Sequence, residues 1–163
     1  IGAQLGSGAD EESVSLANQL KSEYGGTTYA QFAALHLAAM SVADGELAEA
    51  EQELRWVLGK AAKGSDTAQV AQMRLARVLA ASGQTEQALA ILAEAGEGDY
   101  AASYAVAEGD ILLAAGREDE ARTAYGEALA LSGGGSRVNL PALQQKLQSL
   151  NDTVPRPSSC AIW

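Results

Sequence analysis

The sequence predicts an all-α fold, an α-solenoid of about three helical hairpins with a capping helix at each end. Ala and Leu dominate a chain of 163 residues that contains only three Pro, and β-branched residues are sparse, which favours helices over sheets. In addition, one helix–turn–helix pattern occurs three times along the chain. Internal repeats of this length are typical of helical solenoids.

The clearest copy of the pattern is the segment 73–95, which reads MRLARVLAASGQTEQALAILAEA. Apolar residues recur at three- and four-residue steps on both sides of Ser82-Gly83. Gly adopts the left-handed backbone that ends a helix at no steric cost. The segment therefore predicts two antiparallel helices joined by a tight turn.

The three copies align on the turn glycines Gly45, Gly83 and Gly116. Three kinds of residue then recur at matching positions: a small residue before the turn (Ala38, Ala76, Gly109), a second after it (Ala50, Ala88, Ala121), and a larger apolar residue further on (Leu54, Leu92, Tyr125). Small residues allow two helices to approach closely, and the larger residue fills the space beside them. This pattern resembles the tetratricopeptide repeat.

The helices before and within the repeats follow from the same signals. Asp10, Glu11 and Glu12 interact favourably with a helix N-terminus and predict the start of an N-terminal capping helix over about 10–24. The paired glycines at 25–26 end it. The repeats are then predicted at about 28–63, 67–95 and 100–131.

The C-terminal part is predicted to hold one more helix. A Gly-rich connector at 132–136 leads to a capping helix over about 140–150, with Pro141 in its first turn. We therefore expect a tetratricopeptide-repeat domain over residues 1–151. Residues 152–163 contain two further Pro and no periodicity, which predicts an extended or disordered tail.

Charge and composition exclude several classes of function. The chain carries 21 acidic and 11 basic residues, a net charge of −10, which repels nucleic acids and anionic lipid surfaces. The acidity either keeps the chain soluble or provides a docking surface for a basic partner. Direct membrane binding is not expected of this segment, because it contains no long apolar run.

No arrangement of residues predicts catalysis, a metal site or a cofactor. His36 is the only histidine and Cys160 the only cysteine, so neither a metal-ligand cluster nor a nucleophile with its base can be assembled. The acidic residues lack the spacing of a calcium loop. We therefore predict that the protein is not an enzyme.

Resemblance to tetratricopeptide repeats implies a binding groove lined by the first helix of each repeat. Transferred by position, it gives the following groove residues: Phe32, Leu35, Val70, Met73, Arg77, Ser103, Val106 and Asp110. Each position fits core packing as well as binding. The mainly apolar lining favours exposed apolar segments of a polypeptide as ligands, and Met adapts its shape to varied partners.

Most of the chain also resembles one bacterial family. The resemblance lies in three segments: YGGTTYAQFAALHLAAMSVADGELAEAEQELRWVL, AQMRLARVLAASGQTEQALAILAEAGEGDY and GDILLAAGREDEARTAYGEAL. They are similar to the YfgM family of ancillary SecYEG translocon subunits. This resemblance implies a domain on the periplasmic side of the inner membrane, held by a single-pass anchor N-terminal to this segment. It also implies the translocon, a PpiD-like foldase and exported clients as protein partners.

The main hypothesis from the sequence is therefore a non-enzymatic, protein-binding scaffold that works with a periplasmic chaperone or foldase on exported proteins. The alternative is a self-associating adaptor in cell-envelope assembly. Binding to the translocon distinguishes the two hypotheses, because concentration-dependent self-association without such binding favours the adaptor.

Overall fold

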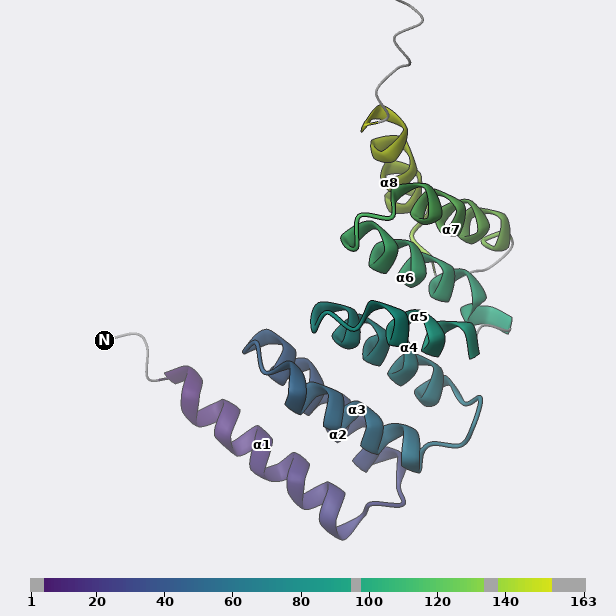
Figure 1. Ribbon diagram of the computed structural model, residues 1–163. Helices are drawn as coiled ribbons and strands as arrows, with labels where there is room; N and C mark the ends of the chain where they lie inside the picture. The colour runs from purple at the N-terminus through teal and green to yellow at the C-terminus, as the bar shows by residue number, and fades with distance from the viewer. Residues whose placement is uncertain (1–4, 95–97, 134–137, 154–163) are drawn as a thin grey trace, which may run out of the picture. The chain divides into compact units, whose positions relative to one another are not determined.

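The computed structural model describes residues 5–94, 98–133 and 138–153. Most of these residues lie in helices and none lies in a strand, which confirms the predicted all-α class (Figure 1). The helices have the following bounds: α1 Leu5–Glu23, α2 Thr28–Ala43, α3 Leu47–Lys60, α4 Asp66–Ala81, α5 Thr85–Glu94, the 3₁₀ turn η1 Gly98–Tyr100, α6 Ala101–Ala114, α7 Glu118–Leu131 and α8 Leu140–Thr153. The chain divides into two compact units, residues 1–91 and 92–163.

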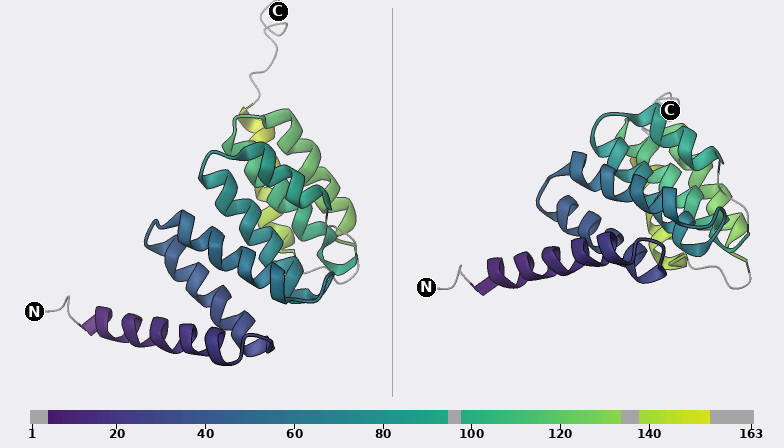
Figure 2. Two further views of the ribbon diagram at one scale, coloured as in Figure 1. Left: turned by 60° about the horizontal axis from the view of Figure 1, so that its bottom comes forward. Right: turned by 90° about the horizontal axis from the view of Figure 1, so that it is seen from below.

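In the first unit, consecutive helices pack on one another. Helix α1 packs against α2, α2 against α3, and α3 against α4 (Figures 1 and 2). Thr27 and Ser65 cap α2 and α4, because each hydroxyl accepts a hydrogen bond from the backbone N–H three residues later. The Lys21 ammonium lies 2.6 Å from the Glu53 carboxylate and joins α1 to α3.

In the second unit, α6 and α7 form a hairpin and α8 packs against α7. Tyr125 on α7 is fully buried, and its ring lies against Gly109 of α6. A Cβ atom at Gly109 would lie only 2.5 Å from Tyr125 Cε1. The third copy therefore requires Gly where the other two copies have Ala, because the residue packed against it is Tyr125 and not Leu.

The three hairpin turns share one backbone geometry. Gly45, Gly83 and Gly116 have φ values of +79°, +83° and +79°. In each turn the N–H of the residue after the glycine donates to the carbonyl five residues earlier, over 2.8–2.9 Å, as in a Schellman motif. The small residues that flank these turns are buried, with relative exposures of 0–2% for Ala38, Ala76, Ala50, Ala88 and Ala121.

The structure differs from the sequence prediction at both capping helices. Helix α1 begins at Leu5 rather than near Asp10, because glycine in a first turn weakens a helix by only about 1 kcal/mol and does not end it. Helix α8 continues to Thr153 rather than ending at 150. The next helix-breaking residue is Pro155, so nothing stops the helix sooner.

Part of the predicted C-terminal region lies outside the described residues. This holds for residues 154–163 of the predicted tail, including Cys160, and for most of the Gly-rich connector. Residues 152–153 of the predicted tail belong to α8. Among the described helices, none combines the length and hydropathy that a membrane span needs.

Candidate protein-binding groove

Helix α2 is apolar on nearly every side, yet one of its faces is exposed. Its inner face is buried and includes Ala34, Leu37 and Ala38. On the outer face, Tyr29 is 74% exposed and Phe32 54%. A helix that is apolar all round is normally covered on every side. The exposed face of α2 is therefore a candidate surface for a partner.

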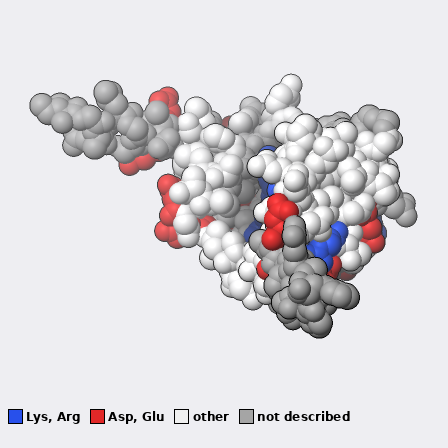
Figure 3. Space-filling model, turned by 90° about the horizontal axis from the view of Figure 1, so that it is seen from above, with Lys and Arg blue, Asp and Glu red and all other residues white. Residues whose placement is uncertain are grey.

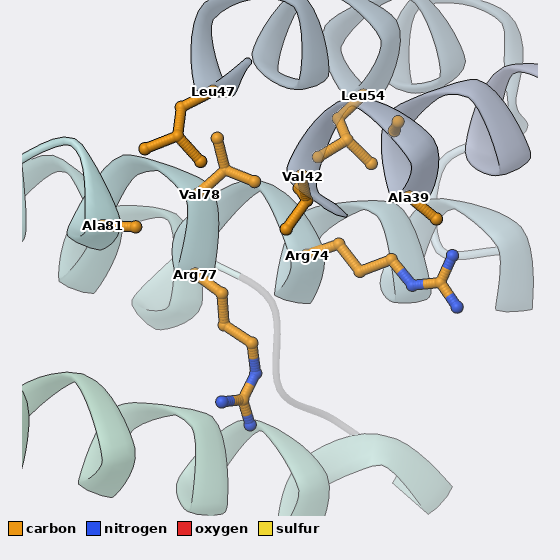
Figure 4. A pocket seen from close by; sticks show the side chains of 9 residues that line it. Ala39, Val42, Leu47, Leu54, Arg74, Arg77, Val78 and Ala81 are labelled. Atoms are coloured by element: carbon orange, nitrogen blue, oxygen red, sulfur yellow. The ribbon is translucent and has the colours of Figure 1, made fainter. Parts of the chain in front are cut away.

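One hollow beside this face is almost entirely apolar. We call it the apolar hollow; it has a volume of ≈ 290 Å³ and is lined by Ala38, Ala39, Val42, Leu47, Leu54, Arg74, Arg77, Val78 and Ala81. Figure 4 shows the aliphatic side chains of α2, α3 and α4 converging, while the two arginine side chains extend from α4 away from this cluster. The hollow offers room for an aliphatic side chain in an apolar environment.

A second hollow adjoins the first. We call it the polar hollow; it has a volume of ≈ 650 Å³ and is lined by Phe32, Leu35, His36, Ala39, Asp66, Thr67, Val70 and Arg74. Ala39 and Arg74 line both hollows, so these two residues lie where the hollows meet. The polar hollow lies toward the N-terminal ends of α2 and α4, and the apolar hollow is lined by their C-terminal halves together with α3. Together the hollows form one groove between two parallel helices, the α2–α4 groove.

The groove differs in charge from the chain as a whole. Its lining holds two arginines and one acidic residue, Asp66, whereas the chain has a net charge of −10. On the face drawn in Figure 3, uncharged atoms cover most of the described surface, and charged side chains occur in separate groups. The groove is thus an apolar surface with local positive charge.

Half of the residues predicted for a groove lie in this one. Phe32, Leu35 and Val70 line the polar hollow and Arg77 the apolar hollow. Leu35 is 8% exposed, so most of its surface belongs to the core. Met73 is half-buried and lines neither hollow.

The other predicted residues, Ser103, Val106 and Asp110, lie on α6 in the second unit and are half-buried. The Asp110 carboxylate is engaged within that unit. Its Oδ1 accepts a hydrogen bond from the Tyr125 hydroxyl at 2.5 Å and pairs with Lys146 Nζ at 2.6 Å. These contacts give Asp110 a packing role, and binding by α6 stays a prediction.

Arg74 is the main groove residue that the sequence prediction missed. The positions transferred from tetratricopeptide repeats include its neighbours in the sequence but not Arg74 itself. Helical periodicity was the signal that could have found it, because Arg74 follows Val70 by four residues and precedes Val78 by four. All three line the groove.

A separate hollow of ≈ 300 Å³ lies among α1, α2 and α3. Its floor includes Val14, Leu37 and Met40, and its acidic side chains come from Asp44, Glu46, Glu49 and Glu53. Within the described part of the chain, no three His, Cys, Asp or Glu side chains are grouped closely enough to hold a metal ion.

Comparison with known proteins identifies the family. A model of the tetratricopeptide repeat-like domain matches residues 2–152. The chain belongs to this family. Tetratricopeptide repeat-like domains are generally non-catalytic modules that bind other proteins, so the family supports an interaction scaffold with protein partners. No curated protein and no solved structure matched the chain.

Proposed function

We propose that this tetratricopeptide repeat-like protein is a non-enzymatic scaffold that binds a polypeptide segment of a partner in the α2–α4 groove. The observation that carries the proposal is the uncovered apolar face of α2 beside the apolar hollow. Phe32 at one end of the groove and Val42 at the other are 54% and 46% exposed. About half of each side chain is already buried, so covering the rest against a partner gives roughly 0.7–1.5 kcal/mol for each.

The proposed cellular role is assistance to exported proteins on the periplasmic side of a bacterial inner membrane. Its support is the resemblance of three long segments to the YfgM family, together with the family match to a protein-binding domain. In this proposal an anchor preceding the segment holds the domain near the SecYEG translocon. The groove binds the translocon, a PpiD-like foldase or the exported chain itself.

Site-specific crosslinking tests the proposal. A photoreactive amino acid replaces Phe32 in the full-length protein in its host bacterium, and captured proteins are identified by mass spectrometry. The control probe replaces Gln87, which is exposed on α5 and does not line the groove. We expect Phe32 to capture translocon subunits, a foldase or exported proteins, and Gln87 to capture far less of them.

A second variant ties the capture to the groove. Val42→Asp introduces a charge into the apolar hollow at an exposed position, so the fold is retained while binding of an apolar side chain is disfavoured. Capture from Phe32 is expected to fall at least tenfold. Capture that is unchanged by Val42→Asp refutes the groove as the binding site. Crosslinks between copies of the chain alone refute the translocon proposal and favour a self-associating adaptor.

A further inference from the structure

The position of Arg74 indicates which segments the α2–α4 groove selects, and this inference rests on the proposed use of that groove. Arg74 is exposed on α4 and lines both hollows. Within the described residues it forms no hydrogen bond or ion pair, whereas Arg55, Arg117 and Arg122 each pair with an acidic side chain three or four residues away in the sequence. The guanidinium of Arg74 is therefore available to a ligand.

The charge around Arg74 favours an anionic ligand. Two arginines and one aspartate line the groove, so its basic side chains outnumber its acidic ones. Elsewhere the chain is strongly acidic and repels acidic segments. An acidic side chain is thus attracted to Arg74 in the groove and repelled by the net negative charge of the chain as a whole, which favours the groove over other sites.

The place of Arg74 along the groove identifies the source of the carboxylate. Phe32 and Val42 mark the two ends and lie ten residues apart on α2, which corresponds to about 15 Å of helix. About five residues of extended chain cover this length. Arg74 lies between these ends, where the two hollows meet. A segment that fills both hollows continues past Arg74, so the carboxylate belongs to a side chain and not to a chain end.

The groove offers two kinds of contact to one bound segment. The apolar hollow accepts an aliphatic side chain, and the Arg74 guanidinium, which Figure 4 shows extending from α4 past Ala39, can pair with a carboxylate. We propose that the α2–α4 groove selects internal, extended polypeptide segments that combine an aliphatic side chain with an Asp or Glu. The aliphatic side chain enters the apolar hollow, and the carboxylate pairs with Arg74.

Selection from a peptide library tests this inference. The probe is a display library of short random peptides flanked on both sides by Gly-Ser linkers, so that no free carboxyl terminus reaches the groove. The full chain is immobilised as wild type, Arg74→Gln, Val42→Asp and Arg55→Gln. Arg55 is the matched control, because it is an exposed arginine of the same unit outside the groove lining. Circular dichroism checks that all four proteins fold.

We expect wild type and Arg55→Gln to enrich peptides that combine an aliphatic with an acidic residue. Arg74→Gln is expected to enrich aliphatic residues without the acidic preference. For a selected peptide with blocked ends, Arg74→Gln should weaken binding roughly three- to tenfold, the range for a partly exposed charge-assisted pair. It should leave the Glu→Gln form of that peptide unaffected. The difference should shrink at high salt.

The outcomes separate this inference from the proposed function. If Arg74→Gln retains the acidic preference, or the wild type shows none, the selection by Arg74 is refuted while groove binding stands. If a library with free carboxyl termini is enriched and the internal library is not, the side-chain source is refuted. If the wild type enriches nothing, or Val42→Asp enriches the same peptides as the wild type, the groove itself is refuted.

Discussion

Gly109→Ala is expected to destabilise the protein although Ala is the better helix former. In an exposed helix, replacing Gly by Ala stabilises by about 1 kcal/mol. At Gly109 the new Cβ lies 2.5, 2.6 and 2.9 Å from Cε1, Cδ1 and Cζ of Tyr125. These distances are below van der Waals contact. The ring must therefore move for the methyl group to fit.

The ring of Tyr125 is held in place, which makes the movement costly. Tyr125 is fully buried, and its hydroxyl donates a hydrogen bond to Asp110. Overpacking of a core typically costs about 1–3 kcal/mol, and a ring fixed at both ends favours the upper part of this range. After subtraction of the gain in helix propensity, we expect Gly109→Ala to lower the free energy of unfolding by about 1–2 kcal/mol.

Gly126→Ala is the matched control, and urea unfolding followed by circular dichroism at 222 nm is the assay. Gly126 lies in the middle of α7, is exposed, and has no atom within 4 Å of an added Cβ. We expect Gly126→Ala to stabilise by about 1 kcal/mol, so that one substitution has opposite signs at two sites. If Gly109→Ala is as stable as Gly126→Ala, the close packing of α6 on α7 is refuted.

A double variant tests the same contact from the other side. In the first copy of the repeat the corresponding pair is Ala38 and Leu54, both buried. Combining Gly109→Ala with Tyr125→Leu recreates that pair in the third copy. We expect the double variant to be more stable than the sum of the single effects by at least about 1 kcal/mol, as is found for residues in contact. Additive effects would contradict this explanation of Gly109.

Three further predictions concern charged side chains. Burial, and then the charges of two neighbouring glutamates, raise the pKa of Glu108 above its ordinary 4.5. The protonated carboxyl therefore stabilises the fold below pH 4.5, and this stabilisation is lost as the pH rises through the raised pKa. In thermal unfolding, Glu108→Gln should gain stability relative to wild type between pH 4 and pH 7, and an unchanged difference would contradict this. Lys21→Met leaves the Glu53 carboxylate, whose side chain is 19% exposed, without its cation, and should lower the free energy of unfolding by about 1–3 kcal/mol. Amide exchange in α1 should become faster, and unchanged exchange would contradict the link between α1 and α3. Asp110→Asn weakens the pair with Lys146 and should cost about 1 kcal/mol with faster exchange in α8, whereas a binding role alone would leave exchange unaffected.

The hairpins were predictable from the sequence because their determinants are local. A glycine at φ near +80° ends the first helix, and small residues at fixed distances from it permit close packing. Both signals lie within about 20 residues of each other. The ends of the capping helices were predicted less well, since acidic residues favour a helix start without requiring one.

The groove was only partly predictable, because its lining depends on side chains from separate helices. A transferred pattern of positions includes Phe32, Val70 and Arg77, which line the hollows, but it omits Arg74, which lines both. It also predicts Asp110 as a groove residue, and that binding role stays a prediction. The partner of Asp110 on α8, Lys146, is 36 residues away in the sequence, and no local periodicity reveals a pair over that distance.

Comparison of α2 with α6 shows why the exposed face of α2 is informative. Both helices are rich in Ala and aliphatic residues and have almost no polar face, so composition alone predicts the same burial for each. Helix α6 exposes one large apolar residue, Leu113 at 37%, whereas α2 exposes two aromatic rings and Val42. Large exposed apolar surface promotes aggregation unless a partner covers it. Since composition does not distinguish the two helices, the exposure of α2 reflects its place beside the groove. A segment bound in the groove would cover this apolar face.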